Sequence, residues 1–527
     1  MTSPYLEQLL ADGYLEEIDL IFAKWLSKKT GREEEEEQIF LAALFWSSRQ
    51  GHLCFSLDEE ILSHFGKEKM KILEYSKKGS QNFPFYPFIC QEAGYFYLQK
   101  NWMFETQFHF HLKRLIAQGK KAAKLDKIDD LTEEQHRAVM NALSFSLSLI
   151  SGGPGTGKTH TAAKIVEVFL KQNRDARVLL AAPTGKAARR LSTNNSWGKG
   201  VVVSTLHSLL GIHRESPFNL EPSPLMADLL IVDECSMVDA RLFSHLLASV
   251  KEGTHLVLIG DPHQLPAVEN GSLFADLVDL LKNRSSACLT LLTRCLRSDR
   301  QEILECMQSV LKGDLVQHGS QLLQITDYTA VDRKYAEIRK IAETNFTQPD
   351  QPASDPELLL ARFSRFTLLS CLRRGPFGVD ALNQMLADHF LDTWKGGMAL
   401  AMPILITKSS EDRNLFNGET GLLMRHRSRS EDYAIFGPPG SLRKIPAVQL
   451  PAYEYAYALS VHKSQGSEYD EVLLLVPPGS EQLGREVIYT GASRAKKHLR
   501  IAADQNALTG ALLRPSRKIS ALHLRNF

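Results

Sequence analysis

From about residue 126 onward, short apolar runs alternate with segments in which apolar positions recur every three or four residues. Such runs are typical of strands buried on both faces, and the segments between them are typical of amphipathic helices. The alternation therefore predicts an α/β fold with parallel sheets covered by helices. The expected strands are residues 147–150, 178–182, 229–232 and 256–259 in a first block, and 366–370, 471–476 and 499–502 in a second.

Two regions depart from this alternation. Residues 1–125 consist mainly of helical-looking stretches with an aromatic-rich segment, and they contain no phosphate-binding signature. Between about 402 and 450, short strand-like stretches are separated by turn-forming pairs such as Asn417-Gly418, which predicts a small β insertion. The predicted domains are 1–125, mainly helical; 126–285, the first α/β lobe; and 286–527, the second lobe with its insertion.

Composition narrows the class of protein. The formal net charge is only +1 over 527 residues, which excludes a strongly basic surface and confines any nucleic-acid site to a local groove. The seven cysteines are scattered and never spaced as C-x-x-C, so we expect reduced thiols rather than disulfides or zinc and iron–sulfur ligands. No uncharged apolar stretch reaches 18 residues, and the amino terminus lacks the segments of a signal peptide, so we expect a cytoplasmic protein without a membrane partner.

The first expected strand runs directly into a glycine-rich loop that matches the phosphate-binding P-loop at every defined position. In such a loop, consecutive backbone N–H groups surround phosphate oxygens, and the following helix directs its positive end at them. Lys158 would reach the outer phosphates of a nucleoside triphosphate, and Thr159 would bind Mg²⁺. The loop and the residue after it are Gly152, Gly153, Pro154, Gly155, Thr156, Gly157, Lys158, Thr159 and His160, all expected to bind nucleotide.

Further polar residues fit the chemistry of a nucleotide site. The third expected strand ends in Asp233 and Glu234, which could bind the metal through water and polarise the attacking water, respectively. The next strand leads into a turn with Gln264, whose amide could contact the terminal phosphate. Before the loop, Thr132 has the position of a helix cap, and Gln135 is placed to read an adenine edge.

Seven motifs, in order, resemble those of superfamily 1 helicases, most closely those of RecD, the family of alpha subunits of exodeoxyribonuclease V. The resemblance covers about residues 126–505, and the amino-terminal region carries only a faint likeness around 51–54. It implies two RecA-like P-loop lobes with parallel sheets, ATP in the cleft between them, an SH3-like β insertion, and single-stranded DNA across their top. The motifs are residues 152–159, 182–188, 205–207, 233–237, 260–266, 462–468 and 489–495.

The resemblance also implies site residues. Arg494 is similar to the family's arginine finger and Arg297 to its partner, and both would neutralise charge on the transferring phosphoryl group. The implied catalytic set is Lys158, Asp233, Glu234, Gln264, Arg297 and Arg494, with ATP and Mg²⁺ as cofactors. The implied DNA contacts are Pro183, Thr184, Gly185, Thr205, His207, His462, Ser464 and Gln465. For each DNA contact, a helix cap or loop hydrogen bond is the alternative. Residues 211–226 fit either the family's duplex-splitting hairpin or a plain surface loop.

Three functions are consistent with these residues. We favour an ATP-dependent 5′–3′ DNA helicase subunit of a RecBCD-type complex, with RecB-like and RecC-like partners, that unwinds DNA ends in double-strand break repair and recombination; the polarity is by analogy. A stand-alone RecD-like helicase is the second, although residues 1–125 show no helix-hairpin-helix repeats. The third, an ATP-gated assembly module without unwinding, does not require the complete catalytic set. No nuclease motif stands out, so we expect cutting to belong to a partner.

Overall fold

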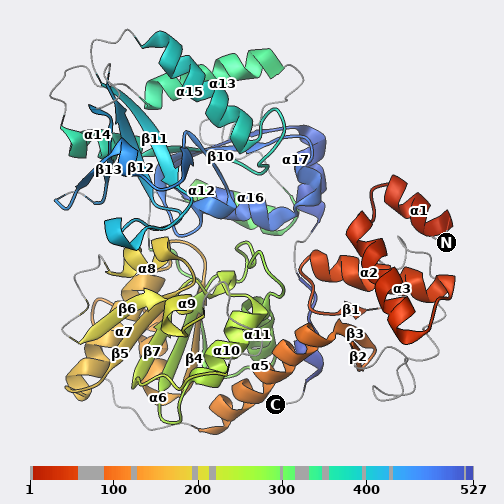
Figure 1. Cartoon of the computed structure of the whole chain (residues 1–527). Coiled ribbons are helices and arrows are strands. Elements are labelled where there is room, and N and C mark those ends of the chain that lie inside the picture. The colour runs from red at the N-terminus through yellow and green to blue at the C-terminus, as the bar shows by residue number, and fades with distance from the viewer. Residues whose placement is uncertain are drawn as a thin grey trace.

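In the computed structural model the described residues are 4–56, 88–119, 127–192, 197, 200–212, 221–296, 301–314, 331–346, 355–394, 399–426, 431–438, 440–514 and 518–525. They form two α/β lobes, a β insertion on the second lobe, and an amino-terminal domain to one side (Figure 1). The two parallel sheets and the β insertion confirm the predicted fold class. Arg297 and residues 213–220, half of the segment 211–226, lie outside the described residues.

The first lobe is built on a six-stranded sheet in which every neighbouring pair is parallel. In sheet order, its strands are β6 (Val201–Thr205), β5 (Val178–Ala182), β7 (Leu229–Val232), β8 (His255–Gly260), β4 (Leu147–Gly152) and β9 (Leu289–Leu292). Successive residues face opposite sides, so Leu149 packs into one apolar cluster and Ile150 into another. Because both faces are covered, the strands carry the unbroken apolar runs seen in the sequence.

Helices cover both faces of this sheet (Figure 1). One face packs against α5 (Gln99–Ala117), α10 (Ala240–Ser249) and α11 (Leu273–Asn283). The other packs against α6 (Glu133–Ser144), α7 (Lys158–Gln172) and α8 (Gly185–Ser192). A single turn, α9 (Leu206–Leu209), follows β6. The cap expected at Thr132 is confirmed, because its hydroxyl accepts a hydrogen bond of 3.2 Å from the N–H of Gln135 in the first turn of α6.

The second lobe has a four-stranded parallel sheet. In sheet order, its strands are β16 (Ala458–Ser460), β10 (Phe366–Ser370), β17 (Tyr469–Val476) and β18 (Ala495–Ala503). The helices on one face are α12 (Gln301–Leu311), α16 (Arg485–Ala492) and α17 (Gln505–Leu513). Those on the other face, beside the insertion, are α13 (Val331–Asn345), α14 (Pro356–Phe363) and α15 (Val379–Thr393). Neighbouring β10 residues divide between the two faces, with Leu368 on one and Leu369 on the other.

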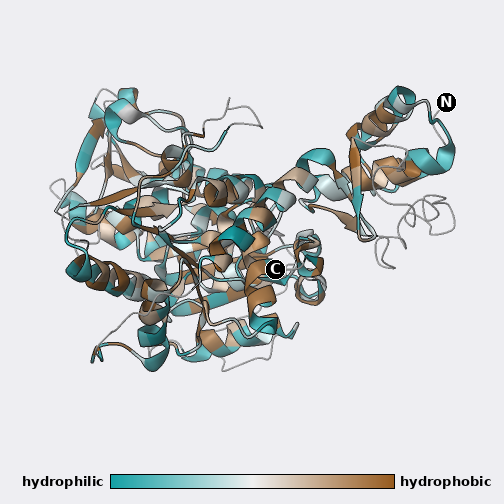
Figure 2. Cartoon of the chain, turned by 90° about the horizontal axis from the view of Figure 1, so that it is seen from below, coloured by the Kyte–Doolittle hydropathy of each residue, from teal (hydrophilic) through white to brown (hydrophobic). Residues whose placement is uncertain are grey.

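The remaining strands form two antiparallel sheets. The insertion holds five strands, in the order β14 (Arg443–Pro446), β13 (Tyr433–Phe436), β12 (Thr420–Arg425), β11 (Leu400–Ile406) and β15 (Tyr453–Tyr455). The amino-terminal domain combines α1 (Pro4–Ala11), α2 (Glu17–Thr30) and α3 (Glu35–Arg49) with the short strands β1 (Phe55–Ser56), β3 (Tyr95–Leu98) and β2 (Ile89–Glu92). Figure 2 shows this domain projecting away from the lobes. The insertion therefore extends a few residues beyond 402–450 at both ends.

Two predicted domain boundaries need correction. The boundary at 285/286 is wrong because β9 pairs in parallel with β4, so the first lobe continues to at least Leu292. The boundary at 125/126 is also wrong, since Phe108 on α5 packs edge-on against Phe243 of the first lobe, with ring centroids 5.2 Å apart. In addition, the segment 518–525 leaves the second lobe and hydrogen-bonds to the amino-terminal domain. Each of these memberships depends on contacts between residues distant in sequence.

The docking of α5 predicts a measurable difference between two phenylalanines on that helix. Phe108→Ala should destabilise the first lobe by about 3–5 kcal/mol, because it leaves a cavity in a fully buried cluster. Phe110→Ala is the matched control, since Phe110 is 65% exposed, and its effect should stay within about 0.5 kcal/mol. Urea unfolding followed by fluorescence measures both. Equal shifts for the two variants would contradict the assignment of α5 to the core of the first lobe.

Candidate functional site

Three strand ends converge at one edge of the first sheet. Strands β7, β8 and β4 are consecutive neighbours and all parallel, so their carboxyl ends lie side by side. The acidic pair follows β7, the turn with Gln264 follows β8, and the P-loop follows β4. Ligands of open α/β sheets bind at this edge. The fold therefore brings together the three motifs that the sequence singled out.

The P-loop forms a cradle that depends on its glycines. Gly155 and Gly157 adopt φ of +78° and +82°, a left-handed conformation that residues with a Cβ atom rarely adopt. A Cβ on Gly157 would also collide with the amide of Gln135. The ammonium of Lys158 folds over the loop and donates to the carbonyl oxygens of Gly152, at 2.6 Å, and Gly153, at 2.8 Å. The loop thus holds a cation against a concave backbone, which suits a polyphosphate.

Gln135 anchors the helix α6 to this loop. Its Oε1 accepts a hydrogen bond from the N–H of Thr132 at 3.1 Å, and its Nε2 donates to the carbonyl oxygen of Thr156 at 3.1 Å. The side chain is buried. The amide is therefore next to the P-loop, as expected for a nucleotide-binding residue, and its reading of adenine stays a prediction. His160, on the other side of the loop, lies 3.7 Å from Asp130.

The acidic pair has the strained geometry of a functional site. Glu234 adopts φ of +55°, a left-handed conformation that non-glycine residues rarely hold, and its N–H donates to Oδ1 of Asp233 at 2.8 Å. Burial, and then the charge of Glu234, raise the pKa of Asp233 to about 6, against the pull of Lys158. A divalent cation beside the two carboxylates would offset this repulsion, so the donor set fits Mg²⁺. Thr159, in the first turn of α7, is the other expected ligand.

A buried carboxylate, Asp261, organises the turn after β8. It accepts hydrogen bonds from the hydroxyl of Tyr489 at 3.0 Å and from the N–H of His263 at 3.1 Å. The Nε2 of Gln264 lies 3.4 Å from the same carboxylate. The Oε1 of Gln264 is buried and has no hydrogen-bond partner among the described residues. An unpaired buried acceptor is costly, and a water or phosphate-bound proton would satisfy it.

The second lobe closes the other side of the cleft with α16 and the residues after it. The Tyr489 hydroxyl would stand 3.4 Å from a Cβ on Gly153, so it lies beside the P-loop. Arg494 is buried and donates within its own lobe, to the carbonyl oxygen of Thr490 and to the hydroxyl of Ser493. Burial lowers its pKa, while the carboxylates of Glu234, Glu468 and Asp261 oppose this. Arg494 thus lies within electrostatic range of the acidic pair on the opposite lobe.

The sequence did not single out Asp261 or Tyr489 for this contact. A carboxylate at the carboxyl end of β8, in the tight turn Gly260-Asp261-Pro262, was the available signal. Its partner lies 228 positions away, so no local pattern could identify the pair. The described residues end just before the other predicted arginine, Arg297. The preceding residue, Leu296, donates its N–H to the carbonyl oxygen of Gly155 at 3.1 Å. The chain thus passes the P-loop one residue before Arg297.

Six of the eight expected DNA contacts fall into three groups, and the other two, Pro183 and Gly185, are half-buried. Thr184 and Thr205 cap helices, with their hydroxyls accepting from the N–H groups of Ala187 and Ser208, both at 3.2 Å. Ser464 and Gln465 are buried, and their side chains donate to the carbonyl oxygens of Val461 and Leu265. The exposed members are His207 and His462. The capping alternative accounts for the two threonines, and DNA contact by any of these residues stays a prediction.

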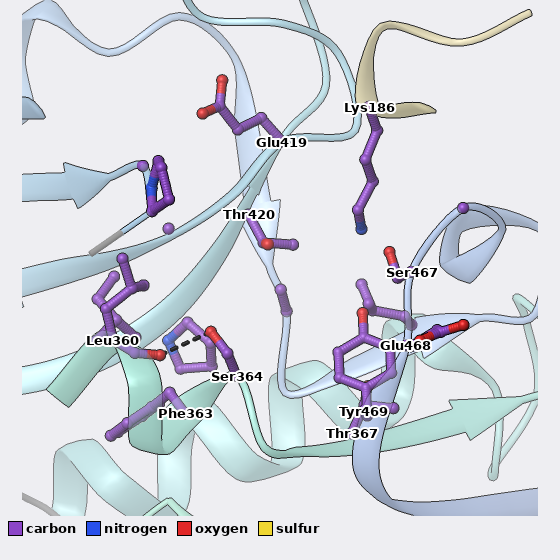
Figure 3. A pocket seen from close by; sticks show the side chains of 18 of the residues that line it. Lys186, Leu360, Phe363, Ser364, Thr367, Glu419, Thr420, Ser467, Glu468 and Tyr469 are labelled. Atoms are coloured by element: carbon purple, nitrogen blue, oxygen red, sulfur yellow. Dashed lines mark hydrogen bonds between the residues drawn. The ribbon is translucent and has the colours of Figure 1, made fainter. Parts of the chain in front are cut away.

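A cavity of about 390 Å³ separates α8 from the second lobe and the insertion. Figure 3 shows Lys186 of the first lobe directed toward Ser467 of the second, with Glu419 of the insertion above them. The Lys186 ammonium and the Ser467 hydroxyl are buried and have no hydrogen-bond partner among the described residues. Glu419 pairs with Arg189 of α8 and so connects the insertion to the first lobe. The cavity therefore offers the Lys186 ammonium and the Ser467 hydroxyl as donors to a negatively charged polymer.

Other features of the described residues bear on the class of protein. None of their helices is both long and apolar enough to span a bilayer. Within the same part of the chain, no cluster of three His, Cys, Asp or Glu side chains has the arrangement of a metal site. All seven cysteines are free, and six of them are buried. Burial raises the pKa of the Cys371 thiol to about 12, which makes it unreactive.

The chain is similar to several known proteins. Residues 135–270 match the AAA domain family and residues 455–502 the UvrD-like helicase C-terminal domain family. The chain is similar to the ATP-dependent RecD2 DNA helicase of Deinococcus radiodurans, with 30% identity over 393 residues that cover 72% of this chain and 50% of that one. A crystal structure of Pif1 helicase from Candida albicans is similar at 17% identity and a TM-score of 0.43, covering 73% of this chain and 97% of that one.

A relative of nearly the same extent decides the family. The RecBCD enzyme subunit RecD of Mycolicibacterium smegmatis is 31% identical over 466 residues, which cover 81% of this chain and 82% of that protein. Such identity over most of both chains, together with the intact P-loop, acidic pair and glutamine turn, accounts for the motifs as a set. The chain therefore belongs to the RecD family and is an ATP-dependent DNA helicase.

Proposed function

We propose that this chain is the 5′–3′ motor subunit of a RecBCD-type complex, in which it unwinds DNA ends together with RecB-like and RecC-like subunits. The observation that carries the motor assignment is the cleft between the lobes, where the P-loop, Asp233 and Gln264 face Tyr489 and Arg494. A site divided between two lobes can couple hydrolysis to their relative motion. The RecD relative of similar length supports the assembly.

Within the cleft, each residue has a distinct task in ATP hydrolysis. Lys158 moves from the loop carbonyls to the outer phosphates, and Glu234 orients and deprotonates the attacking water. Bound Mg²⁺, which Thr159 and Asp233 would hold, supplies positive charge to the phosphate oxygens. The Oε1 of Gln264, which has no hydrogen-bond partner among the described residues, accepts a hydrogen bond from the water beside the terminal phosphate. Arg494 stabilises the charge that develops on the transferring phosphoryl group.

Three hydrogen bonds connect the phosphate-sensing turn to the second lobe. Tyr489 donates to Asp261, the N–H of Leu265 donates to the hydroxyl of Thr490 at 2.8 Å, and Gln465 donates to the carbonyl oxygen of Leu265 at 3.2 Å. All are buried, so each exchange of partners has a substantial cost. When the terminal phosphate leaves, a shift of the turn therefore shifts the second lobe. This motion is our proposed power stroke on DNA.

The cavity beside α8 is our proposed part of the DNA path. Lys186 and the hydroxyl of Ser467 provide a charge and a donor from opposite lobes, as gripping a phosphate across the cleft requires. Neither group reads a base edge, in keeping with a motor that acts on any sequence. Near-neutral net charge means that affinity for DNA comes from such local contacts and from partner subunits.

The amino-terminal domain carries the proposed partner surface. Ile18, Ile21 and Trp25 lie three and four positions apart on one face of α2, and they are 45%, 59% and 53% exposed. Trp25 also contacts Phe88, itself 37% exposed. Soluble proteins rarely expose contiguous apolar side chains of this size unless another protein covers them. The stripe supports a subunit rather than the stand-alone alternative, the RecD2-like helicase, half of whose length this chain covers.

Lys158→Gln should abolish DNA-stimulated ATP hydrolysis, with a loss of about 100-fold or more, because the outer phosphates lose their charged partner. Folding and assembly with the partner subunits should be unchanged. Lys171→Gln is the control, since Lys171 lies on the outer surface of the same helix and is paired only with Glu167. Steady-state hydrolysis and size-exclusion chromatography measure the two properties. Loss of assembly in Lys158→Gln would support the ATP-gated module instead.

Replacing Ile21 and Trp25 together by serine should weaken assembly with co-expressed RecB-like and RecC-like subunits at least about tenfold, since exposed aromatic anchors dominate such interfaces. Hydrolysis by the isolated chain should be unchanged, because the stripe is far from the cleft (Figure 1). Lys113→Ser, at an exposed position on α5, is the control. Full assembly of the double variant would remove α2 from the proposed interface, and active solitary unwinding would favour the stand-alone helicase.

A further inference from the structure

The segment immediately after Gln264 is held from outside the first lobe. Residues 267–271 connect the glutamine turn to α11, and the amino-terminal domain and the carboxyl-terminal segment both bind them. The turn is also fixed to the second lobe, through Asp261 before Gln264 and through Leu265 after it. Gln264 therefore lies, along the chain, between the Asp261 contact and residues 267–271. The contacts of residues 267–271 involve parts of the chain outside both RecA-like lobes.

Lys518 supplies the charged half of these contacts. Its ammonium donates to three consecutive backbone carbonyls, those of Ala267, Val268, at 3.0 Å, and Glu269. The side chain is 8% exposed. The ammonium has three N–H groups, and it donates to three backbone oxygens in a row. One side chain thus determines the path of three residues next to the phosphate-sensing glutamine.

The amino-terminal domain supplies the neutral half. The N–H of Gly271 donates to the carbonyl oxygen of Gly51 at 2.8 Å. The Nδ2 of Asn270 donates to the hydroxyl of Ser48 at 3.1 Å and to Oδ1 of Asn101 at 3.3 Å. Ser48 belongs to α3 of the amino-terminal domain and Asn101 to α5, which packs on the first lobe, so two helices contact the same residue. Movement of this domain would be transmitted directly to residues 267–271.

Gly51 and Lys518 are matched to each other. Gly51 adopts φ of +89°, and a Cβ at this position would lie 2.5 Å from the Lys518 ammonium. The next residues extend the junction, since the N–H of Ile519 donates to Nδ1 of His52 at 2.9 Å and the N–H of Leu53 donates to the carbonyl oxygen of Ile519 at 2.9 Å. The junction thus brings residues 51–53 of the amino-terminal domain and the carboxyl-terminal segment together on the first lobe.

The gripped segment also borders a second cavity. Glu269 and Asn270 line a space of about 440 Å³ together with His207, one of the residues expected to contact DNA, and Lys100 of α5. Residues 267–271 therefore adjoin Gln264, a predicted DNA contact and the amino-terminal domain.

We propose that Lys518 is a positioning residue for ATP hydrolysis: with Gly51 and Asn270 it holds residues 267–271 so that Gln264 is aligned with the terminal phosphate, and it makes the rate of hydrolysis depend on the state of the amino-terminal domain. The inference rests on the proposed role of Gln264. Lys518 contacts no substrate, so it acts on the rate through the backbone. It adds to the motor a route by which a partner on the amino-terminal domain sets the rate of the ATPase.

Two substitutions test this role. Lys518→Met removes the ammonium that holds residues 267–269, and Gly51→Ala places a methyl group against that ammonium. For each, kcat of DNA-stimulated hydrolysis should fall about fivefold or more, because small misplacements of aligned groups are costly. KM for ATP should stay within about twofold, since the P-loop is untouched. The double variant should lose no more than either single one, because both disrupt one junction. Lys282→Met, an exposed lysine on α11, is the control. Rates are normalised to the concentration of nucleotide-binding sites, which corrects for unfolded protein.

A chain that already carries Gln264→Ala distinguishes a positioning role from a purely structural one. Adding Lys518→Met to this chain should cause no further loss of kcat, because the side chain that Lys518 would align is already absent. A wild-type chain without DNA-stimulated hydrolysis would overturn the proposed function itself. With an active wild type, an unchanged kcat in Lys518→Met and Gly51→Ala, or equal losses with and without Gln264, would overturn the positioning role alone. A decrease confined to the number of binding sites would reduce the junction to a stabilising contact, which also contradicts the proposal.

Discussion

The structure depends on the parallel order of β7, β8 and β4. These strands are neighbours that run in the same direction, so their carboxyl ends lie side by side. The acidic pair, the glutamine turn and the P-loop therefore meet there although they are distant from one another in sequence. Both faces of the sheet must then be buried, which explains the unbroken apolar strands and the two layers of helices. The second lobe meets the first at the carboxyl ends of these strands.

At that edge the chain accepts unfavourable local arrangements. Glu234 is left-handed, Asp233 is half-buried beside a second carboxylate, and the Oε1 of Gln264 lacks a donor among the described residues. Each costs free energy in the folded chain. A metal ion would offset the repulsion between the carboxylates, and a water would satisfy the Oε1 of Gln264. The same groups are fixed by contacts that do not face the nucleotide, above all the buried pair of Asp261 and Tyr489. Strain and support together describe a site organised before its substrates arrive.

Much of this could be predicted from the sequence because the signals are local. A P-loop lies within eight residues, and an acidic pair or a cap follows directly from its own strand or helix. What failed depends on distant contacts. Strand β9 belongs to the first lobe because it pairs with β4, and α5 belongs there because Phe108 packs against Phe243. The junction at Lys518 forms because the carboxyl-terminal segment returns from the second lobe to residues 267–269. The burial of Ser464 and Gln465 likewise depends on the second lobe's packing, which a motif does not reveal.

We propose that hydrolysis in the cleft moves the lobes along DNA in one direction. Unwinding of duplexes with a single-stranded 5′ or 3′ tail is the most direct test. In this experiment the chain is assembled with its RecB-like and RecC-like subunits, and the other motor in the complex is inactivated. ATP-dependent strand separation from the 5′ tail is expected, and none when Lys158 is replaced. Unwinding only from the 3′ tail, or none from either tail despite active hydrolysis, would contradict it.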